Sequence, residues 1–237
     1  MDAKNRIITI LLLGFLGLLV FSSAIPTGPT EINITSNTTA SGSSSGGMVN
    51  ISGGYIAKLN VTATVQNPHW KAFVGWIEGS FVLNDATGST IYDWSSGTTS
   101  GEVYATRTSG AINWNTITCA DAGEILAEET AMAHTGQDNI SSTFSKTNDN
   151  VFNIAGSPQI AIDACSSQNA FVSNSSNDAT FEEIIVHDGT NIVYASIIED
   201  ASQGYDGNNY DFQMLIPENG SSGFTGATAY YLYVEIS

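Results

Sequence analysis

The chain has 237 residues and is strongly acidic, with 6 Lys or Arg against 23 Asp or Glu and a net charge of −17. Such a charge repels nucleic acids and anionic membrane surfaces, which excludes both as partners. Hydrophobic residues make up 42% of the chain and aromatic residues 10%, enough to fill a core. The composition therefore predicts a folded protein rather than a disordered one.

The first 24 residues have the pattern of a secretory signal peptide. Lys4 and Arg6 form a basic leader, an apolar run of 15 residues follows at 7–21, and small residues at 22–24 supply a cleavage site. At about 1.5 Å per residue the run spans about 22 Å, less than the ~30 Å hydrocarbon core. We therefore expect cleavage, no stable membrane span afterwards, and an extracellular or cell-surface location. A retained membrane anchor is the alternative.

Residues 25–50 are rich in Ser, Thr and Gly and predict a linker. Such a segment has little apolar surface with which to offset the entropy lost on ordering, so a flexible tether is expected. Alternation over residues 31–35 allows a second interpretation, in which this segment is a donated strand. It would then add to the open sheet edge of a neighbouring copy.

Period-two alternation of apolar and polar residues is unbroken from residue 55 to residue 66. Tyr55, Leu59 and Val61 fall on the apolar face, and Asn60 falls on the polar face. This pattern predicts a half-buried strand of an antiparallel sheet. We assign residues 51–237 to a single folded domain.

Strand-like runs recur along the rest of this domain. They cover residues 70–77, 81–83, 90–94, 102–106, 111–114, 160–164, 181–186, 191–198, 210–216 and 227–236. The Asp-Gly step between the runs at 181–186 and 191–198 predicts a tight hairpin turn. Residues 121–134 are the one helix candidate, with an irregular loop as the alternative. We predict an all-β fold, an antiparallel β-sandwich of jelly-roll or immunoglobulin-like layout with at most one short helix.

Two further features agree with export. Cys119 and Cys165 form an even pair that we expect to be bridged in an oxidising compartment, with two buried free thiols as the alternative. Seven Asn-x-Ser/Thr sequons predict N-linked glycans. They lie at Asn33, Asn37, Asn50, Asn60, Asn139, Asn174 and Asn219.

The acidic loop at residues 199–211 is the best ligand candidate. Asp206, Asn208 and Asp211 supply oxygen atoms of the kind that calcium prefers, beside glycines that allow tight turns. The loop lacks the terminal Glu of an EF-hand, and a solvated turn built from Asn, Asp and Gly is the favoured alternative. Calcium is the one cofactor that the sequence suggests.

No catalytic constellation is evident, and we predict that the chain is not an enzyme. The residues at 42–46 match G-x-S-x-G, but they lie in the linker rather than on a strand-to-helix turn. Glu182 and Glu183 are adjacent on a predicted strand and so point to opposite faces, which prevents them from acting together as a glycosidase pair. The four tryptophans are expected in the core, with a sugar-stacking platform as the alternative.

Several stretches resemble uncharacterised exported proteins of archaea. They are residues 70–75 (WKAFVG), 91–94 (IYDW), 101–107 (GEVYATR) and 210–218 (YDFQMLIPE). The resemblance covers most of residues 50–237 and implies a cell-surface protein of the kind that builds envelopes or filaments. It transfers no functional residues.

These features together suggest a structural subunit of an extracellular surface assembly, such as a filament, sheath or surface layer. β-Sheet contacts between copies would build this homopolymer, with glycans on its outside. The alternative is a secreted adhesin or glycan-binding module that uses aromatic side chains and calcium.

Overall fold

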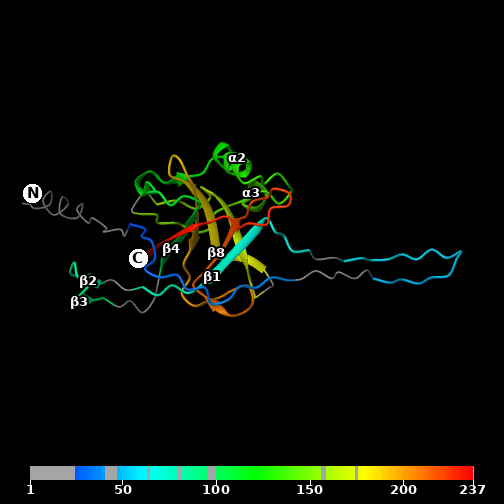
Figure 1. Cartoon of the computed structure of the whole chain (residues 1–237), viewed down its shortest axis with the longest axis horizontal. Coiled ribbons are helices and arrows are strands. Elements are labelled where there is room, and N and C mark those ends of the chain that lie inside the picture. Colours follow the sequence, from blue (N-terminus) through cyan, green and yellow to red (C-terminus); the bar gives the residue numbers. More distant parts are fainter. Residues whose placement is uncertain are drawn as a thin grey trace, which may run out of the picture.

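The computed structural model describes residues 25–40, 47–62, 65–79, 82–94, 100–155, 159–173 and 176–236 (Figure 1). The predicted signal peptide at 1–24, the G-x-S-x-G match at 42–46 and the sequon at Asn174 lie outside these residues.

A seven-stranded antiparallel sheet forms the centre of the fold, in the order β13-β4-β9-β8-β7-β6 with β5 paired to β8. We call it the main sheet. Its strands are β4 (Gly101–Thr106), β5 (Thr118–Cys119), β6 (Lys146–Thr147), β7 (Ser166–Val172), β8 (Ser176–His187), β9 (Ile192–Ile197) and β13 (Tyr231–Ile236).

A second layer packs on one face of the main sheet. It contains the antiparallel pair of β1 (Trp70–Gly75) and β12 (Phe212–Pro217) together with α2 (Ala122–Ala131) and α3 (Ile140–Thr143). The remaining elements are the pairs β2 (Val82–Asn84) with β3 (Thr90–Asp93) and β10 (Ser202–Gln203) with β11 (Asn209–Tyr210), and the 3-10 turn η1 (Trp114–Thr116).

Two hydrophobic clusters bury both faces of the main sheet. On β8, Ile184 packs in a cluster with Phe152, whereas Ile185 packs in a second cluster with Met214. Successive side chains of a strand point to opposite faces, so the central strands contribute to both cores. Fully burying each such side chain contributes about 1.5–3 kcal/mol. The prediction of an all-β antiparallel sandwich is confirmed.

The β8–β9 hairpin follows its predicted turn chemistry. Gly189 has a φ of +94°, a conformation that glycine adopts at little cost. The Asp188 carboxylate accepts hydrogen bonds from the backbone N–H groups of Thr190 and Asn191, which fixes the turn.

The helix candidate is also confirmed, as α2. Asp121 is its N-cap and forms a capping box with Glu124: the Asp121 side chain accepts from the Glu124 N–H, and the Glu124 side chain accepts from the Asp121 N–H.

Three of the predicted strands are wrong. The described part of residues 55–66 belongs to no sheet, because no strand of the described residues lies beside it. Residues 111–114 are irregular up to Trp114, which begins η1, and their apolar side chains fill the core without a ladder. Residues 160–164 contribute one isolated bridge, from Ile160 to Phe152.

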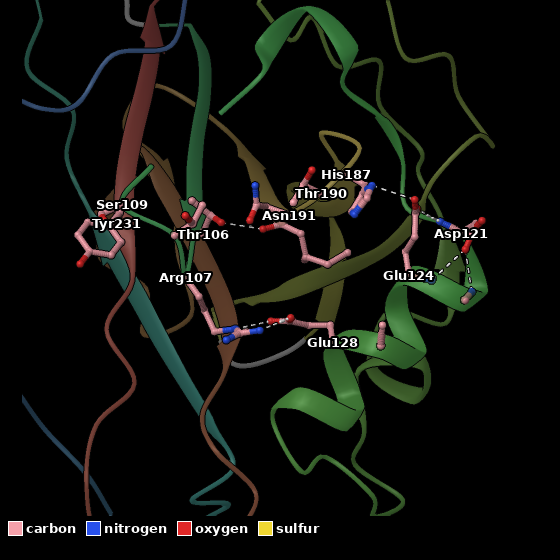
Figure 2. A pocket seen from close by; sticks show the side chains of 14 residues that line it. Thr106, Arg107, Ser109, Asp121, Glu124, Glu128, His187, Thr190, Asn191 and Tyr231 are labelled. Atoms are coloured by element: carbon pink, nitrogen blue, oxygen red, sulfur yellow. Dashed lines mark hydrogen bonds and ion pairs between the residues drawn. The ribbon is translucent and has the colours of Figure 1, made fainter. Parts of the chain in front are cut away.

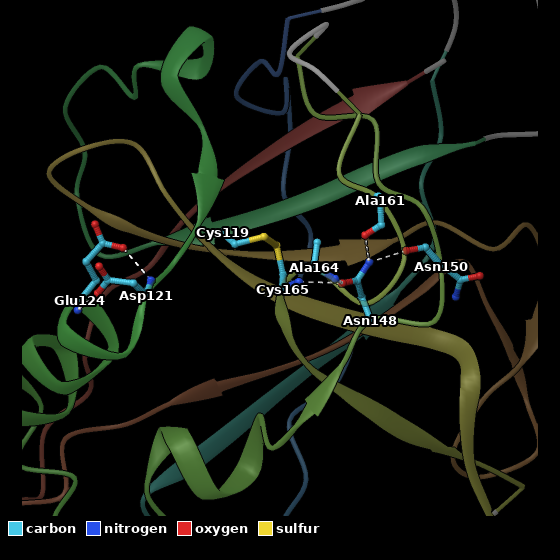
Figure 3. The surroundings of a disulfide bond; sticks show 8 residues. All are labelled: Cys119, Asp121, Glu124, Asn148, Asn150, Ala161, Ala164 and Cys165. Carbon is cyan, nitrogen blue, oxygen red and sulfur yellow. Dashed lines mark hydrogen bonds between the residues drawn. A yellow bond between two sulfur atoms is a disulfide. The ribbon is translucent and has the colours of Figure 1, made fainter.

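The predicted disulfide is present and joins Cys119 of β5 to Cys165, just before β7 (Figure 3). Asn148 lies beside the bridge and is fully buried. Its side chain accepts from the N–H groups of Ala164 and Cys165 and donates to the C=O groups of Asn150 and Ala161. Covalent and polar contacts thus fasten the segment before β7 to the sheet.

Candidate functional site

We call residues 31–66 the N-terminal arm, and its described part at 47–62 extends away from the two layers (Figure 1). Every described residue of the arm is exposed. Ile56 is 98% exposed, Val61 82% and Val65 83%. Single exposed apolar residues are ordinary, but a strand-length run with apolar alternation is typical of an interaction surface.

Both ends of the arm are fixed to the folded body. Before the arm, Thr27 forms an antiparallel bridge to Val234 of β13 through two backbone hydrogen bonds of 3.0 and 2.9 Å. After it, Asn67 donates to the Asp138 carboxylate, and Trp70 donates through Nε1 to the Asp138 C=O, 2.8 Å away. The chain therefore leaves and re-enters the body at fixed points.

The arm differs from the body in charge. Between residues 32 and 67, Lys58 is the one charged residue. Residues 68–237 contain 3 basic and 21 acidic residues, a net charge of −18. With Glu31 included, the arm at residues 31–66 has no net charge, so it can approach the acidic body of another copy without the repulsion that opposes contact between two bodies.

A polar pocket of about 650 Å³ lies between α2, the β8–β9 turn and the end of β4 (Figure 2). Arg107 donates through Nε and Nη2 to the two carboxylate oxygens of Glu128, at 2.7 and 2.5 Å. This hydrogen bonding to Glu128 raises the pKa of Arg107. Nδ1 of His187 lies 2.8 Å from Oε1 of Glu124. Because these pairs join α2 to the main sheet, they hold the second layer in place.

Buried carboxylates accept from the backbone of the segment that covers the main sheet. Glu182 accepts from the N–H groups of Asp149 and Asn150, and Glu102 accepts from that of Asn153. Burial, with the neighbouring charge of Glu235 adding to it, raises the pKa of Glu102 to about 7. Sequence reasoning did not identify Glu102 and Glu235, since alternation in β4 and β13 does not mark them as inward-facing.

Glu183 points to the opposite face from Glu182, as predicted. Its Oε2 accepts from the backbone N–H of Leu215 and from Nε2 of Gln168, both at 2.8 Å. Burial raises the pKa of Glu183 to about 8.

The predicted calcium ligands have separate roles within the loop. Asp206 accepts hydrogen bonds from Asn208 and from the Tyr210 hydroxyl. Asp211 is buried and accepts from the backbone N–H groups of Ala201 and Ile77. Within the described ranges, no group of three or more His, Cys, Asp or Glu could hold a metal ion. Calcium binding by this loop stays a prediction.

The tryptophans do not share one environment. Trp114 is buried, as predicted, and Trp70 is half-buried. Trp76 and Trp94 are 58% and 54% exposed, so their predicted core placement is wrong. Trp76 contacts Tyr210 with ring centroids 5.4 Å apart, and Tyr205 stacks on the same tyrosine at 6.1 Å. Trp76 and Tyr205 are exposed and both pack against Tyr210, which is buried.

The described sequons fall into two groups. Four of them are exposed on the arm: Asn33, Asn37, Asn50 and Asn60. The other two, Asn139 and Asn219, are half-buried, and their side chains accept from the N–H groups of Ser142 and Ser221 respectively. Glycosylation stays a prediction at all seven positions.

Comparison with known proteins adds no assignment. No family model, no curated protein and no solved structure matches the chain. None of the helices in the part of the chain that the structure describes is long and apolar enough to cross a membrane.

Proposed function

We propose that this protein is a structural subunit of an extracellular surface assembly, a filament, sheath or surface layer. Copies associate through β-sheet contacts, and each copy donates part of its N-terminal arm to a neighbour. The observation that carries this proposal is the arm itself, a strand-length alternating segment that is exposed throughout its described residues.

Strand addition would bury apolar side chains and pair backbone groups that contact water in the isolated chain. The apolar face of residues 55–66 contacts water, and each of its large side chains would contribute about 1.5–3 kcal/mol if it were fully buried. The backbone of an extended segment also offers N–H and C=O groups that complete a ladder when they meet an open sheet edge. Both gains require an acceptor outside the arm.

An extracellular location is consistent with the other features. A disulfide of this kind persists in oxidising compartments and is rare in the cytosol. The leader-like first 24 residues and the accessible sequons of the arm point to the same compartment.

Leu59→Asp with Val61→Asp is expected to abolish polymer formation while leaving the folded body intact. Both residues are exposed, so the substitutions remove no packing from the monomer and place charge on the face that must be buried after donation. The measurement is electron microscopy and sedimentation of the full chain, expressed with its own leader and purified from the exported fraction.

The matched control is Thr64→Asp with Gln66→Asp, which adds the same charge to the polar face of the same segment and keeps the sequon at Asn60. It should polymerise like the unaltered chain. Monomers of unaltered chain at all protein and salt concentrations would contradict the proposal, and so would equal loss of polymer in both double variants.

A second candidate function is glycan binding, which the exposed rings of Trp76 and Tyr205 on either side of the buried Tyr210 favour. Exposed aromatic faces stack on sugar rings, and Asp206 beside them offers acceptors for hydroxyl groups. A glycan array with the unaltered chain and Trp76→Ala distinguishes the two functions. If the unaltered chain gives only background signal on the array, glycan binding is excluded as a function, and the assembly proposal is not affected.

A further inference from the structure

A groove of about 550 Å³ lies between β7 and β12, with the end of α3 and β6 beside it. Phe171 and Tyr205 line it and are 51% and 46% exposed, so aromatic surface contacts water there. A concave site with a mainly apolar lining and a few polar groups is typical of a ligand pocket. The apolar part of the lining consists of Ala72, Ala170, Phe171, Tyr205, Met214 and Leu215.

A strand from another chain is not a suitable occupant of this groove. The Phe171 C=O accepts from Nε2 of Gln213, and the Ser173 N–H donates to the Gly204 C=O. The backbone at this end of β7 is therefore already bonded within its own chain and is not an open ladder. An occupant has to be recognised by the side chains that line the groove.

A cation marks one end of the groove. Lys146 lies opposite Ser167 in the register of β6 and β7. At about 3.3 Å per residue, Phe171 lies about 13 Å further along β7. Thr143 and Ser145, which precede Lys146 in the chain, also line the groove. The groove therefore runs from a positively charged end with nearby hydroxyl groups toward two aromatic rings.

Lys146 is the one basic residue of the body without a side-chain partner among the described residues. The body contains three basic residues, of which Lys71 pairs with Glu218 and Arg107 pairs with Glu128. None of the described residues that line the groove is Asp or Glu. The lining therefore has a positive charge, although the body has a net charge of −18, and this favours an anionic group beside Lys146.

Glu183 is fully buried next to the groove and does not oppose an anion there at neutral pH. Its Oε2 accepts from the Leu215 N–H and from Nε2 of Gln168, and both of these residues line the groove. Burial raises the pKa of Glu183 to about 8, so its carboxyl group is mostly protonated and uncharged at pH 7.

The two glutamines of the lining have few hydrogen bonds left for a sugar. Gln213 donates through Nε2 to the Phe171 C=O and accepts through Oε1 from the Tyr205 N–H. Gln168 donates through Nε2 to Glu183. A sugar loses hydrogen bonds to water at each hydroxyl group that the protein leaves unpaired, whereas an apolar chain has no such cost. The lining therefore favours a ligand that is apolar except at one end.

From these observations we propose that the groove binds a small amphipathic carboxylate, an unbranched apolar chain with one carboxylate at its end. The carboxylate pairs with Lys146, beside Thr143 and Ser145, and the chain lies along the apolar lining toward Phe171 and Tyr205. Such binding is independent of the assembly proposed above.

The test is equilibrium dialysis of labelled decanoate, whose extended chain is about as long as the separation of Lys146 from Phe171. The full chain is used, together with the arm variant Leu59→Asp/Val61→Asp, which should be monomeric. Both should bind one decanoate per chain to saturation at pH 7. Octanoate should bind about tenfold more weakly, because it buries two fewer methylene groups.

Lys146→Met should weaken decanoate binding about tenfold or more, because it removes the cation and keeps an apolar side chain. Lys146→Arg should retain binding. Ala72→Trp should also weaken it, since this exposed residue lines the groove and the larger ring fills the groove from its wall. The matched control is Lys58→Met, which removes the same charge from the arm and should bind decanoate like the unaltered chain. Circular dichroism confirms that each variant is folded.

Decanoate that does not bind to saturation overturns the inference, and so does equal affinity for decanoate in the unaltered chain and Lys146→Met. Equal loss in Lys146→Met and Lys58→Met overturns it too, since the effect would then come from net charge rather than from the groove.

Discussion

Raising the pH from about 5 to about 9 is expected to lower the free energy of unfolding, and Glu183→Gln is expected to remove most of this fall. Glu183 is fully buried, and burial raises its pKa from an ordinary value near 4.5 to about 8. The folded state therefore holds a proton on Glu183 that the unfolded state releases between these two pKa values.

Over that range the folded chain binds more protons than the unfolded chain, so stability declines as pH rises. The loss begins near pH 4.5 and is complete above pH 8. Because a tenfold change in proton affinity corresponds to about 1.4 kcal/mol, the loss is on the order of 4 kcal/mol. The pKa of Glu102 is also raised, to about 7, so its deprotonation lowers the free energy of unfolding over the same pH range. A smaller decrease with pH should therefore remain in the Glu183→Gln variant.

The measurement is denaturant unfolding of the monomeric arm variant across this pH range, with and without Glu183→Gln. The substituted chain should be the more stable of the two at pH 9, and the difference should shrink toward pH 5. Glu182→Gln is the matched control, because it changes the neighbouring residue on the opposite face, where two backbone N–H groups bind the carboxylate. It should lower stability at every pH. Parallel pH profiles for the unsubstituted chain and Glu183→Gln would show that Glu183 does not titrate in this range.

Local signals in the sequence predict much of the fold. The Asp-Gly step gives the β8–β9 turn, and the Asp121 and Glu124 pair is the pattern of a capped helix. These features depend on residues close together in the chain. The second-layer pair of β1 with β12 joins residues about 140 positions apart, and no short-range pattern specifies it.

The arm shows where the pattern misleads. Alternation at 55–66 predicts a strand with one buried face, and it contains no information on whether the covering sheet belongs to the same chain. The buried glutamates were missed for a related reason: a charged residue on a strand indicates a solvated face until the segment that binds it is known.

Removing the disulfide is expected to cost about 4 kcal/mol of stability on the chain-entropy model, since the bridge closes a loop between residues 46 apart. Cys119→Ala with Cys165→Ala is the suitable variant, because Cys165 is fully buried in an apolar cluster and a serine hydroxyl there would lack a partner. Denaturant unfolding of the monomeric arm variant, with and without the alanine pair, measures the difference.

A reducing agent should destabilise the bridged chain by a similar amount and leave the alanine variant unchanged. The native fold should nevertheless persist without the bridge, because the four hydrogen bonds of Asn148 still fasten the segment before β7 to its neighbours. Unfolding curves that coincide with and without reductant would contradict a stabilising role, because they would mean that the loop is ordered by Asn148 and the core alone.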